Sequence, residues 1–457
     1  MNARFLTSLV ILLSATTFAA TASAQGQPWL SDRRYGEGIG VREGDLELHP
    51  GVAGEVGYDT NYFQNAGTAS EPTIGAVRFR LTPSLSLATL GPQRRQGDGQ
   101  AAIPPKVNFR ARMSASYNEL VATDSNFASE VSDQRHIAGE AGLTLDILPM
   151  RPWGADLYGD FVRIVQPSNN PDTGVAFTRD SVRLGAGVNW RPGGGLFEWR
   201  LGYELQYNFF ERATLQDFNN AQHFAKTRGR WRFFPRTALI YDASLGFVRY
   251  SSGNAANDSN PVRARLGLNG LVTNSFALLV MAGWGASFYE TTGGGPAQQF
   301  DSLIAQAELK WFIIPQPSLE PSAATVGLSS IALGYTRDFE NSYLGDFYQR
   351  DRGYLDFSYF VGGTVLLSLE GGFSHITHPA SFFPGGVART GSFGENRLDA
   401  TAFAEYRTSD TFGLNSTLRY NADISDNAIP TDPGNPASTD NLKFARYEIY
   451  VGARWFM

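Results

Sequence analysis

Basic residues recur at every second position in several stretches of this chain, and these rows are the first candidates for chemistry. The longest row holds Lys226, Arg228, Arg230 and Arg232, and shorter rows hold Arg78, Arg80, Arg110, Arg112, Arg263, Arg265, Arg350 and Arg352. Residues two apart lie on the same face of a β-strand, so each row predicts a strand with one cationic face. Such faces can attract anionic solutes and set the ion preference of a pore.

Acidic residues with similar spacing line other segments and supply the opposite charge. The candidates are Glu140, Asp156, Asp160, Glu198, Glu204, Glu395, Asp399 and Glu405. The alternative interpretation is that these charges only pair across strands and solvate a polar interior. Four cations in one row repel one another, so we expect Glu198, Glu204 and Asp242 to offset part of the row at 226–232. A local preference for anionic solutes would remain.

Catalysis and metal binding have little support in the sequence. The chain has 5 histidines and no cysteine, so a cysteine-ligated metal site is excluded, and no Gly-x-Ser-x-Gly motif is present. His375 and His378 are spaced for at most a weak metal contact and are better read as rim residues. The loop at 423–440 lacks the ligand spacing of a calcium-binding loop. We therefore expect no enzyme, no cofactor and no metal.

The stretch 443–457 shows the element that must carry these rows. Its residues alternate strictly between an apolar face that ends in Trp455 and Met457 and a face that carries Arg446, Glu448 and Arg454. A period of two predicts a β-strand. The same pattern predicts strands, each boundary uncertain by about two to four residues, at 45–59, 74–88, 106–119, 135–147, 154–165, 177–190, 196–210, 222–234, 237–250, 261–271, 275–290, 300–313, 325–338, 347–360, 363–376, 394–408, 411–421 and 443–456.

Connector lengths and aromatic positions decide between a soluble sheet and a membrane barrel. Short connectors alternate with long polar ones, as the periplasmic turns and extracellular loops of a barrel do. Tryptophans lie next to the short connectors (Trp153, Trp190, Trp199, Trp231, Trp311 and Trp455), and tyrosines lie next to the long ones (Tyr58, Tyr117, Tyr207, Tyr289, Tyr335 and Tyr420). Two interfacial girdles explain this sorting. We predict an all-β fold, a transmembrane antiparallel up-and-down barrel of about 18 strands of the bacterial outer-membrane type.

The two ends of the chain fit export and barrel closure. Residues 1–24 read as a secretory signal peptide, 25–44 as a periplasmic N-terminal segment and 45–457 as the barrel. Gly452, Trp455 and Met457 form a candidate assembly signal for the barrel assembly machinery. An even strand count pairs the last strand with the first, so we expect Arg446 and Glu448 beside the inward row from Glu47 to Glu55. The net charge of −6 argues against nucleic acid as a partner.

The first predicted strand and the start of its loop carry a recognisable pattern. Gly40, Gly44, Pro50, Tyr58, Asp59, Asn61 and Phe63 match its positions. In this pattern the chain resembles a family of β-barrel porins of Gram-negative bacteria whose members are often associated with polysaccharide export. The resemblance covers only this first hairpin. It implies an outer-membrane conduit for extracellular or surface polysaccharide, with periplasmic polysaccharide-export proteins as partners, and it implies no catalytic residue.

Barrels of this strand number leave an aqueous lumen unless loops fill it. The expected function is therefore a porin-type conduit in the bacterial outer membrane, surrounded by outer-membrane lipid, with polysaccharide export as the role that the resemblance implies. Two alternatives stay open at this point. One is a general diffusion porin for small polar or anionic solutes. The other is a non-conducting structural or adhesion barrel.

Overall fold

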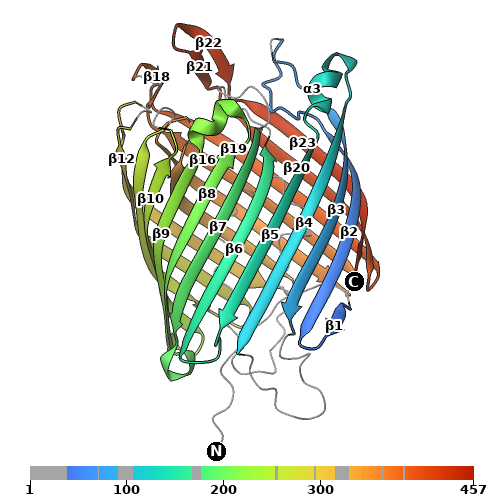
Figure 1. Cartoon of the computed structure of the whole chain (residues 1–457), viewed down its shortest axis with the longest axis vertical. Coiled ribbons are helices and arrows are strands. Elements are labelled where there is room, and N and C mark those ends of the chain that lie inside the picture. Colours follow the sequence, from blue (N-terminus) through green and yellow to red (C-terminus); the bar gives the residue numbers. More distant parts are fainter. Residues whose placement is uncertain are drawn as a thin grey trace, which may run out of the picture.

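The computed structural model describes residues 39–69, 71–90, 106–166, 177–252, 256–292, 295–313, 329–342, 344–362, 364–383 and 386–457. Its main element is one large antiparallel sheet (Figure 1). The strands that build the wall are β2 (Leu46–Asp59), β3 (Ala76–Thr89), β4 (Val107–Ala122), β5 (His136–Ile147), β6 (Trp153–Gln166), β7 (Phe177–Trp190), β8 (Phe197–Phe210), β9 (Asn220–Phe234), β10 (Thr237–Tyr250), β11 (Asp258–Leu271), β12 (Phe276–Glu290), β13 (Phe300–Phe312), β14 (Ser330–Asn341), β15 (Phe347–Val361), β16 (Val365–His378), β19 (Phe393–Ser409), β20 (Phe412–Asp423) and β23 (Phe444–Phe456).

Each wall strand pairs with the next one along the chain, and β2 pairs with β23 from Gly51↔Phe456 to Asp59↔Glu448. The sheet therefore closes into an 18-stranded antiparallel barrel, which confirms the predicted fold class. All of the predicted strands are present. The largest difference is at the strand predicted at 325–338: residues 325–328 lie outside the described residues, and the strand continues to Asn341, three residues past its predicted end.

The register at the closing seam, defined as the β2–β23 pairing, differs from the expectation. Arg446 and Glu448 lie beyond the end of the row from Glu47 to Glu55 and not beside it, so this prediction is wrong. Glu448 pairs with Asp59, and Glu55 pairs with Gly452. Glu47 lies at the other end of β2, where β1 (Val41–Glu43) forms a hairpin with it. The signal-peptide prediction for 1–24 falls outside the described residues.

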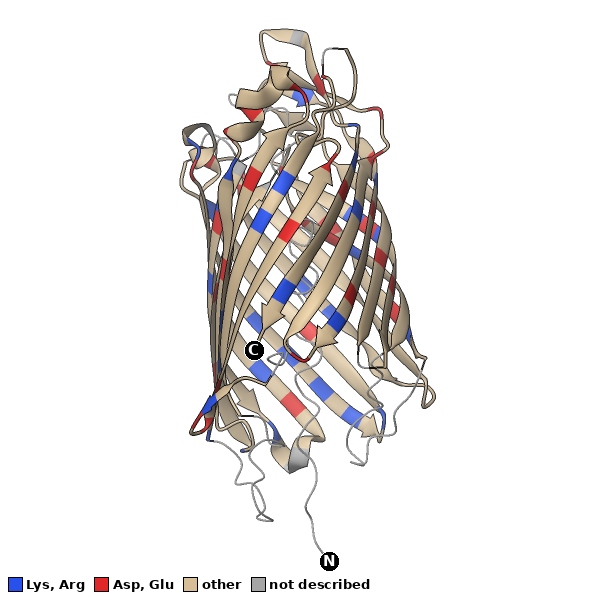
Figure 2. Cartoon of the chain, turned by 90° about the vertical axis from the view of Figure 1, so that its right-hand side faces the viewer, with Lys and Arg blue, Asp and Glu red and all other residues tan. Residues whose placement is uncertain are grey.

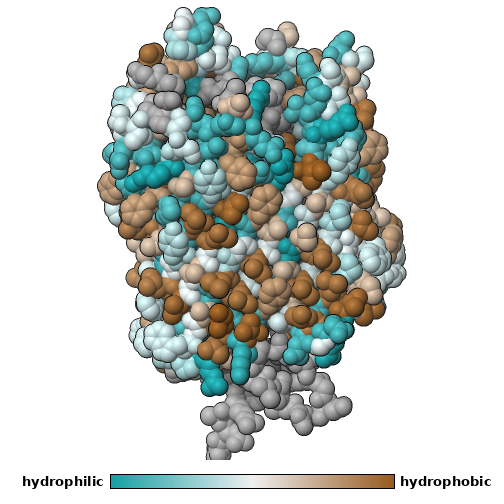
Figure 3. All heavy atoms as spheres, viewed as in Figure 1, coloured by the Kyte–Doolittle hydropathy of each residue, from teal (hydrophilic) through white to brown (hydrophobic). Residues whose placement is uncertain are grey.

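The two faces of the wall have opposite chemistry. Large apolar side chains at alternate positions are exposed on the outer face, for example Leu184, Leu201 and Leu333 at 51%, 50% and 62%. Polar and charged side chains fill many of the intervening inward positions. A soluble protein rarely exposes so much contiguous apolar surface, and a lipid-facing barrel requires it. Figure 3 shows the brown apolar surface on the lower half of one side, below a more polar upper part.

Aromatic residues mark both ends of the wall. At the short-turn end, the rings of Trp153 and Trp190 stack at 5.8 Å, and Phe276 stacks on Trp311 at 6.2 Å. At the long-loop end, Tyr420 and Tyr447 lie 4.6 Å apart. One predicted girdle residue is wrong. Tyr289 points inward, is buried, and donates a hydrogen bond to Asn341 Oδ1 at 2.9 Å.

Short elements decorate the long-loop end, which is the top of Figure 1. They are η1 (Ser125–Phe127), α3 (Ala128–Ser132), η3 (Ala213–Phe218) and two small hairpins, β17 (Ser381–Phe382) with β18 (Ala388–Thr390) and β21 (Ala428–Asp432) with β22 (Asn435–Asn441); η2 (Pro192–Gly195) lies in a short turn. Tyr62, Phe63 and Ile74 of the first loop pack against Leu120 and Val131, which anchors that loop. Among the described residues, no helix has the length and hydropathy of a membrane span.

The upper end of β14 leans into the barrel. Its pairing with β13 stops at Ala305↔Arg337, although both strands continue. Phe339, which alternation would place in lipid, is buried and stacks on inward-facing Phe300 at 4.1 Å. Asn341 Nδ2 donates to Ser259 Oγ at 3.0 Å. The tip of the β14–β15 hairpin is therefore held against the inner face of β11–β13.

The ring of Tyr354 on β15 packs directly against the backbone of Gly334 on β14. A Cβ added at Gly334 would lie 2.1 Å from the Tyr354 ring, whereas one added at Gly353 would meet nothing within 4 Å. Tyr354 donates to Glu308 Oε2 at 2.7 Å, so turning the ring away would also break that bond. We expect Gly334→Ala to destabilise the barrel by about 1–3 kcal/mol, the usual cost of overpacking. Gly353→Ala is the matched control, and equal midpoints for the two variants in thermal unfolding would contradict the prediction.

Candidate solute path in the lumen

All of the predicted basic and acidic residues occupy inward positions of their strands, since the residues between them carry the exposed apolar side chains. Figure 2 shows charged residues spread along the strands over much of the barrel height. They are not equivalent. Some belong to buried networks that solvent does not reach, and others remain accessible in the lumen. Burial of the ion-paired side chains separates the two groups.

The closing seam holds the most buried network. Arg446 binds Asp59 at 2.5 Å and Glu448 at 3.1 Å, and Arg78 binds Glu448 at 2.7 Å. All four side chains are buried. Arg80 pairs with Glu55 at 2.8 Å under the ring of Tyr450. Arg78 and Arg80 therefore point inward, as predicted, but they do not present their charges to a lumenal solute.

Three predicted acids are equally enclosed. Glu405 binds Arg454 and Arg407, and Glu395 binds Arg397 at 2.8 Å. Glu204 receives the hydroxyl of Tyr158 and an ion pair from Lys226. Sequence reasoning did not single out Asp59 as part of an ion network, nor Arg397, Arg407 and Arg454. The sequence feature that could have identified these residues is alternation, which places each of them on the inward face of its strand, near predicted charged residues.

Other predicted residues pair across strands at accessible positions. Arg263 binds Asp338 of the inward-leaning β14 tip at 3.0 Å, and Arg265 binds Asp242 at 3.1 Å. Arg352 binds Asp399 at 2.6 Å, and Arg350 reaches the same carboxylate at 3.7 Å. Asp156 pairs with Arg200 at 2.6 Å, and Asp160 pairs with Arg183 at 2.9 Å. These pairs give a polar wall with little local excess of charge.

The row on β9 divides into paired and unpaired cations. Lys226 binds Glu204 at 2.7 Å and Arg230 binds Glu198 at 2.9 Å, as expected. Asp242, although opposite Arg228 in the register, binds Arg265 instead. On the other side of Arg228, Arg200 is taken by Asp156.

Within the described residues, Arg228 and Arg232 consequently have no carboxylate in ion-pair contact. The same holds for Arg110 and Arg112 on β4. Two inward acids of β5, Glu140 and Asp146, are likewise without an ion-pair partner in that set, and β5 pairs directly with the β4 strand that carries these cations. The excess positive charge is therefore clearest on β9, because the acids on its neighbouring strands, Glu198 and Asp242, already form ion pairs with other cations.

Four connections at the long-loop end are linked through Asp346 and Gln298. The Asp346 carboxylate accepts hydrogen bonds from Asn257 Nδ2 at 2.9 Å and from the Gln298 backbone amide at 2.6 Å. Gln298 Nε2 in turn donates to the Ala380 carbonyl at 2.6 Å. These bonds join the loops after β10, β12, β14 and β16 above the lumen. Burial raises the pKa of Asp346 above its ordinary value.

That raised pKa predicts a pH dependence of the loop cluster. An acid with a higher pKa in the folded state binds its proton more tightly there, so the cluster gains stability as pH falls through the window between its ordinary and raised values. We expect slower amide exchange of Gln298 at low pH, after correction for the intrinsic rate. Asp346→Asn removes the titrating group and should abolish the difference. An equal pH dependence in that variant would assign the effect to another group.

The predicted motif and terminal residues lie at the two ends of the seam. Gly40 and Gly44 have φ of +72° and +59° beside the β1–β2 turn, and Asn61 bridges the first loop to the Ala445 carbonyl at 3.1 Å. Tyr58 faces outward and Phe63 packs in the first-loop cluster.

At the other end of the seam, Pro50 accepts a hydrogen bond from the Met457 amide at 3.0 Å. Gly452 faces Glu55 so closely that a Cβ would lie 2.5 Å from its Cγ, and Trp455 is exposed outward.

The histidines do not converge. His375 is exposed and contacts Asn396 at 2.9 Å, whereas His378 is buried on the opposite face beside Glu395 at 3.3 Å. Their spacing therefore cannot place both rings on one metal ion. No group of three potential ligands suited to a metal occurs in the described part of the chain.

No protein-family model matches this chain, and no curated protein is similar to it in sequence. Solved structures resemble it distantly. Acinetobacter baumannii OccAB4 is 10% identical over 90% of this chain and 98% of its own, with a TM-score of 0.43. Pseudomonas aeruginosa OccK2 (OpdF) in complex with glucuronate is 13% identical over 90% of this chain and 98% of its own, with a TM-score of 0.45. Pseudomonas aeruginosa OpdK with vanillate is 12% identical over 90% of this chain and 99% of its own, with a TM-score of 0.41. Similarity at this level implies no shared substrate.

Proposed function

We propose that this chain is an outer-membrane channel through which small anionic solutes diffuse. The observation that carries the proposal is the position of Arg228 and Arg232, whose neighbouring acids are engaged by other cations. A guanidinium left accessible in a hydrated lumen can bind a carboxylate or phosphate through two parallel hydrogen bonds. Flanking ion pairs keep the wall polar without adding a competing negative charge.

The rest of the expected role belongs to the same proposal. A signal peptide at 1–24 would deliver the chain to the periplasm, and the barrel assembly machinery would recognise a terminal strand that ends in Trp455 and Met457. The expectation of polysaccharide export depends only on the resemblance at Gly40–Phe63. The accessible arginines favour the alternative of a porin for small anions, because anion recognition needs cations that are not already neutralised.

Reconstitution into planar bilayers tests the proposal. A salt gradient of potassium chloride should give a reversal potential of the sign that marks chloride as the more permeant ion. Liposome swelling should be faster with a sugar acid, such as glucuronate, than with the neutral sugar of the same size. Cation selectivity would overturn the anionic-solute proposal, and an absence of conductance would favour the structural barrel. Passage of long neutral oligosaccharides at the rate of the sugar acid would support the polysaccharide conduit instead.

A further inference from the structure

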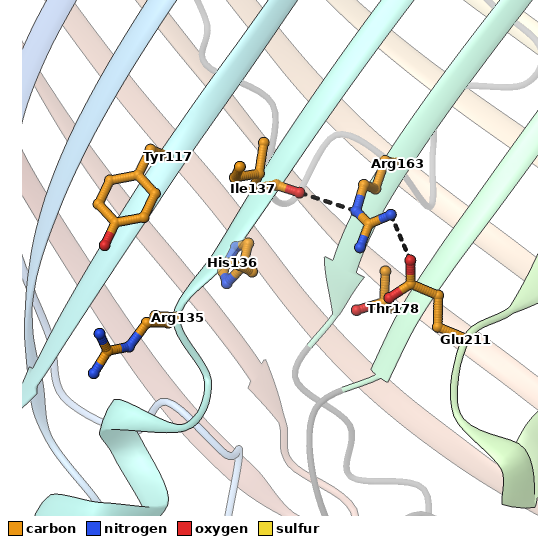
Figure 4. Close-up of a pocket in the computed structure, with 7 residues that line it drawn as sticks. All are labelled: Tyr117, Arg135, His136, Ile137, Arg163, Thr178 and Glu211. Carbon is orange, nitrogen blue, oxygen red and sulfur yellow. Dashed lines mark hydrogen bonds and ion pairs between the residues drawn. The ribbon is translucent and has the colours of Figure 1, made fainter.

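A pocket with charged and apolar lining residues opens on the outer wall of the barrel near its extracellular end. It has a volume of about 580 Å³ and is lined by Tyr117, Arg135, His136, Ile137, Arg163, Thr178 and Glu211 (Figure 4). Ile137 points to lipid and is 56% exposed, and Arg163 shares outward parity with exposed Leu157 on β6. Arg135 directly precedes β5 and Glu211 directly follows β8. The pocket is therefore outside the lumen and at the level where the wall meets the long loops.

The charges in the pocket are unequally satisfied. Arg163 binds Glu211 at 2.5 Å and Asp180 at 3.5 Å, and its Nε donates to the Ile137 carbonyl at 3.1 Å. Glu119, next to the pocket, accepts the hydroxyl of Tyr117. The nearby acids thus already have donors.

Arg135 is the exception. Its Nε donates to the Ser132 carbonyl at 3.1 Å, and it has no carboxylate partner within the described residues. Figure 4 shows its guanidinium at the edge of the pocket, on the same side as the Tyr117 hydroxyl. A cation at this position is available to a ligand that approaches from the membrane.

Apolar surface continues from the pocket towards the middle of the wall. Met113 on β4, Leu143 on β5 and Leu184 on β7 are exposed outward at 57%, 45% and 51%. A ligand that fits both parts needs an anionic, hydroxyl-bearing head for Arg135, Thr178 and Glu211 and acyl chains for the apolar strip. A soluble anion would use only the upper part.

We propose that this pocket binds the phosphorylated sugar headgroup of an outer-leaflet glycolipid. Arg135 pairs with a phosphate through its two free guanidinium nitrogens, a charge-assisted contact that Arg makes better than Lys. Thr178 and Glu211 contact sugar hydroxyls, and Arg163 holds Glu211 in place. The acyl chains lie along Met113, Leu143 and Leu184. This site is independent of the lumen and of the solute that crosses it.

Native mass spectrometry of the full barrel in detergent tests the site, with lipid A and its dephosphorylated form as probes. Lipid A should remain bound to the wild type, and Arg135→Gln should weaken its binding at least tenfold. The matched control is Arg249→Gln, since Arg249 is another outward arginine at the extracellular end but is paired with Asp258 at 3.8 Å and Glu290 at 3.9 Å. That variant should bind as the wild type does. Heat-modifiable mobility on a gel verifies that both variants are folded.

Each alternative result overturns the proposal. Equal binding of lipid A and dephosphorylated lipid A would show that only the apolar strip matters. Equal weakening by Arg135→Gln and Arg249→Gln would indicate a general effect of surface charge. Full competition by inorganic phosphate would identify a site for a free anion rather than for a lipid.

Discussion

A channel that carries Arg228→Glu is expected to lose its preference for anions. Two unit charges 4 Å apart in water interact by about 1 kcal/mol, and reversing the sign of one changes that energy by about twice as much. Since about 1.4 kcal/mol corresponds to a tenfold ratio, a change of about 2 kcal/mol should lower the permeability of chloride relative to potassium about thirtyfold. The reversal potential in a salt gradient measures this ratio directly. The effect should weaken in concentrated salt, where the Debye length shortens to about 3 Å at 1 M.

The control keeps the row but removes one of its ion pairs. Glu198→Gln combined with Arg230→Gln removes one charge of each sign from a pair 2.9 Å apart, so the net charge of the lumen is unchanged. This double variant should keep the selectivity of the wild type. If it loses selectivity as fully as Arg228→Glu, the accessible arginine is not what attracts anions. Unchanged selectivity in Arg228→Glu would have the same meaning.

Removal of Asp59 is expected to be the most damaging single change for stability. Asp59 is fully buried and binds Arg446 at 2.5 Å and Arg78 at 3.4 Å. Asp59→Ala would leave two buried guanidinium groups short of an acceptor, and breaking a buried ion pair from one side usually costs about 3–5 kcal/mol. The midpoint of the heat-induced shift in gel mobility should therefore fall sharply.

An exposed ion pair provides the comparison. Lys443 binds Asp426 at 2.6 Å, with the two side chains 48% and 79% exposed. Asp426→Ala should change the free energy of unfolding by no more than about 1 kcal/mol, as surface pairs do. If Asp59→Ala and Asp426→Ala unfold at the same temperature, the buried network does not stabilise the barrel.

Much of the architecture could be predicted because alternation is a local property. A strand with one lipid face and one polar face shows a period of two wherever it lies, so the strands, their faces and most of the girdle followed from the sequence. Tyr289 and Phe339 are instructive exceptions. Tyr289 has the inward parity of β12, opposite to exposed Phe288, so its assignment to the girdle went against the period of its own strand. Phe339 has outward parity, and nothing in the period of β14 records that the tip of this strand leaves the wall and packs inside.

Charge pairing was predicted less well because it depends on register between strands. Asp242 was expected to offset the β9 row, but its carboxylate lies closer to Arg265 on the other neighbouring strand. Arg446 and Asp59 are 387 positions apart in the sequence and meet only because β23 closes on β2. Arg78 and Arg80 were predicted to be pore-lining cations because the local sequence does not indicate the distant partners that bury them.

The closing seam also has a consequence for how the barrel forms. Asp59 and Arg78 come from the first hairpin, whereas Arg446 and Glu448 come from the last strand, so their bonds cannot exist until both ends of the chain meet. A slip by two residues would keep every side chain on its proper face but shift the partners by about 7 Å along the strand. Four buried charges would then lose their partners. The buried network therefore favours one register of β2 against β23 when the barrel closes, because a slipped register would leave these charges without partners.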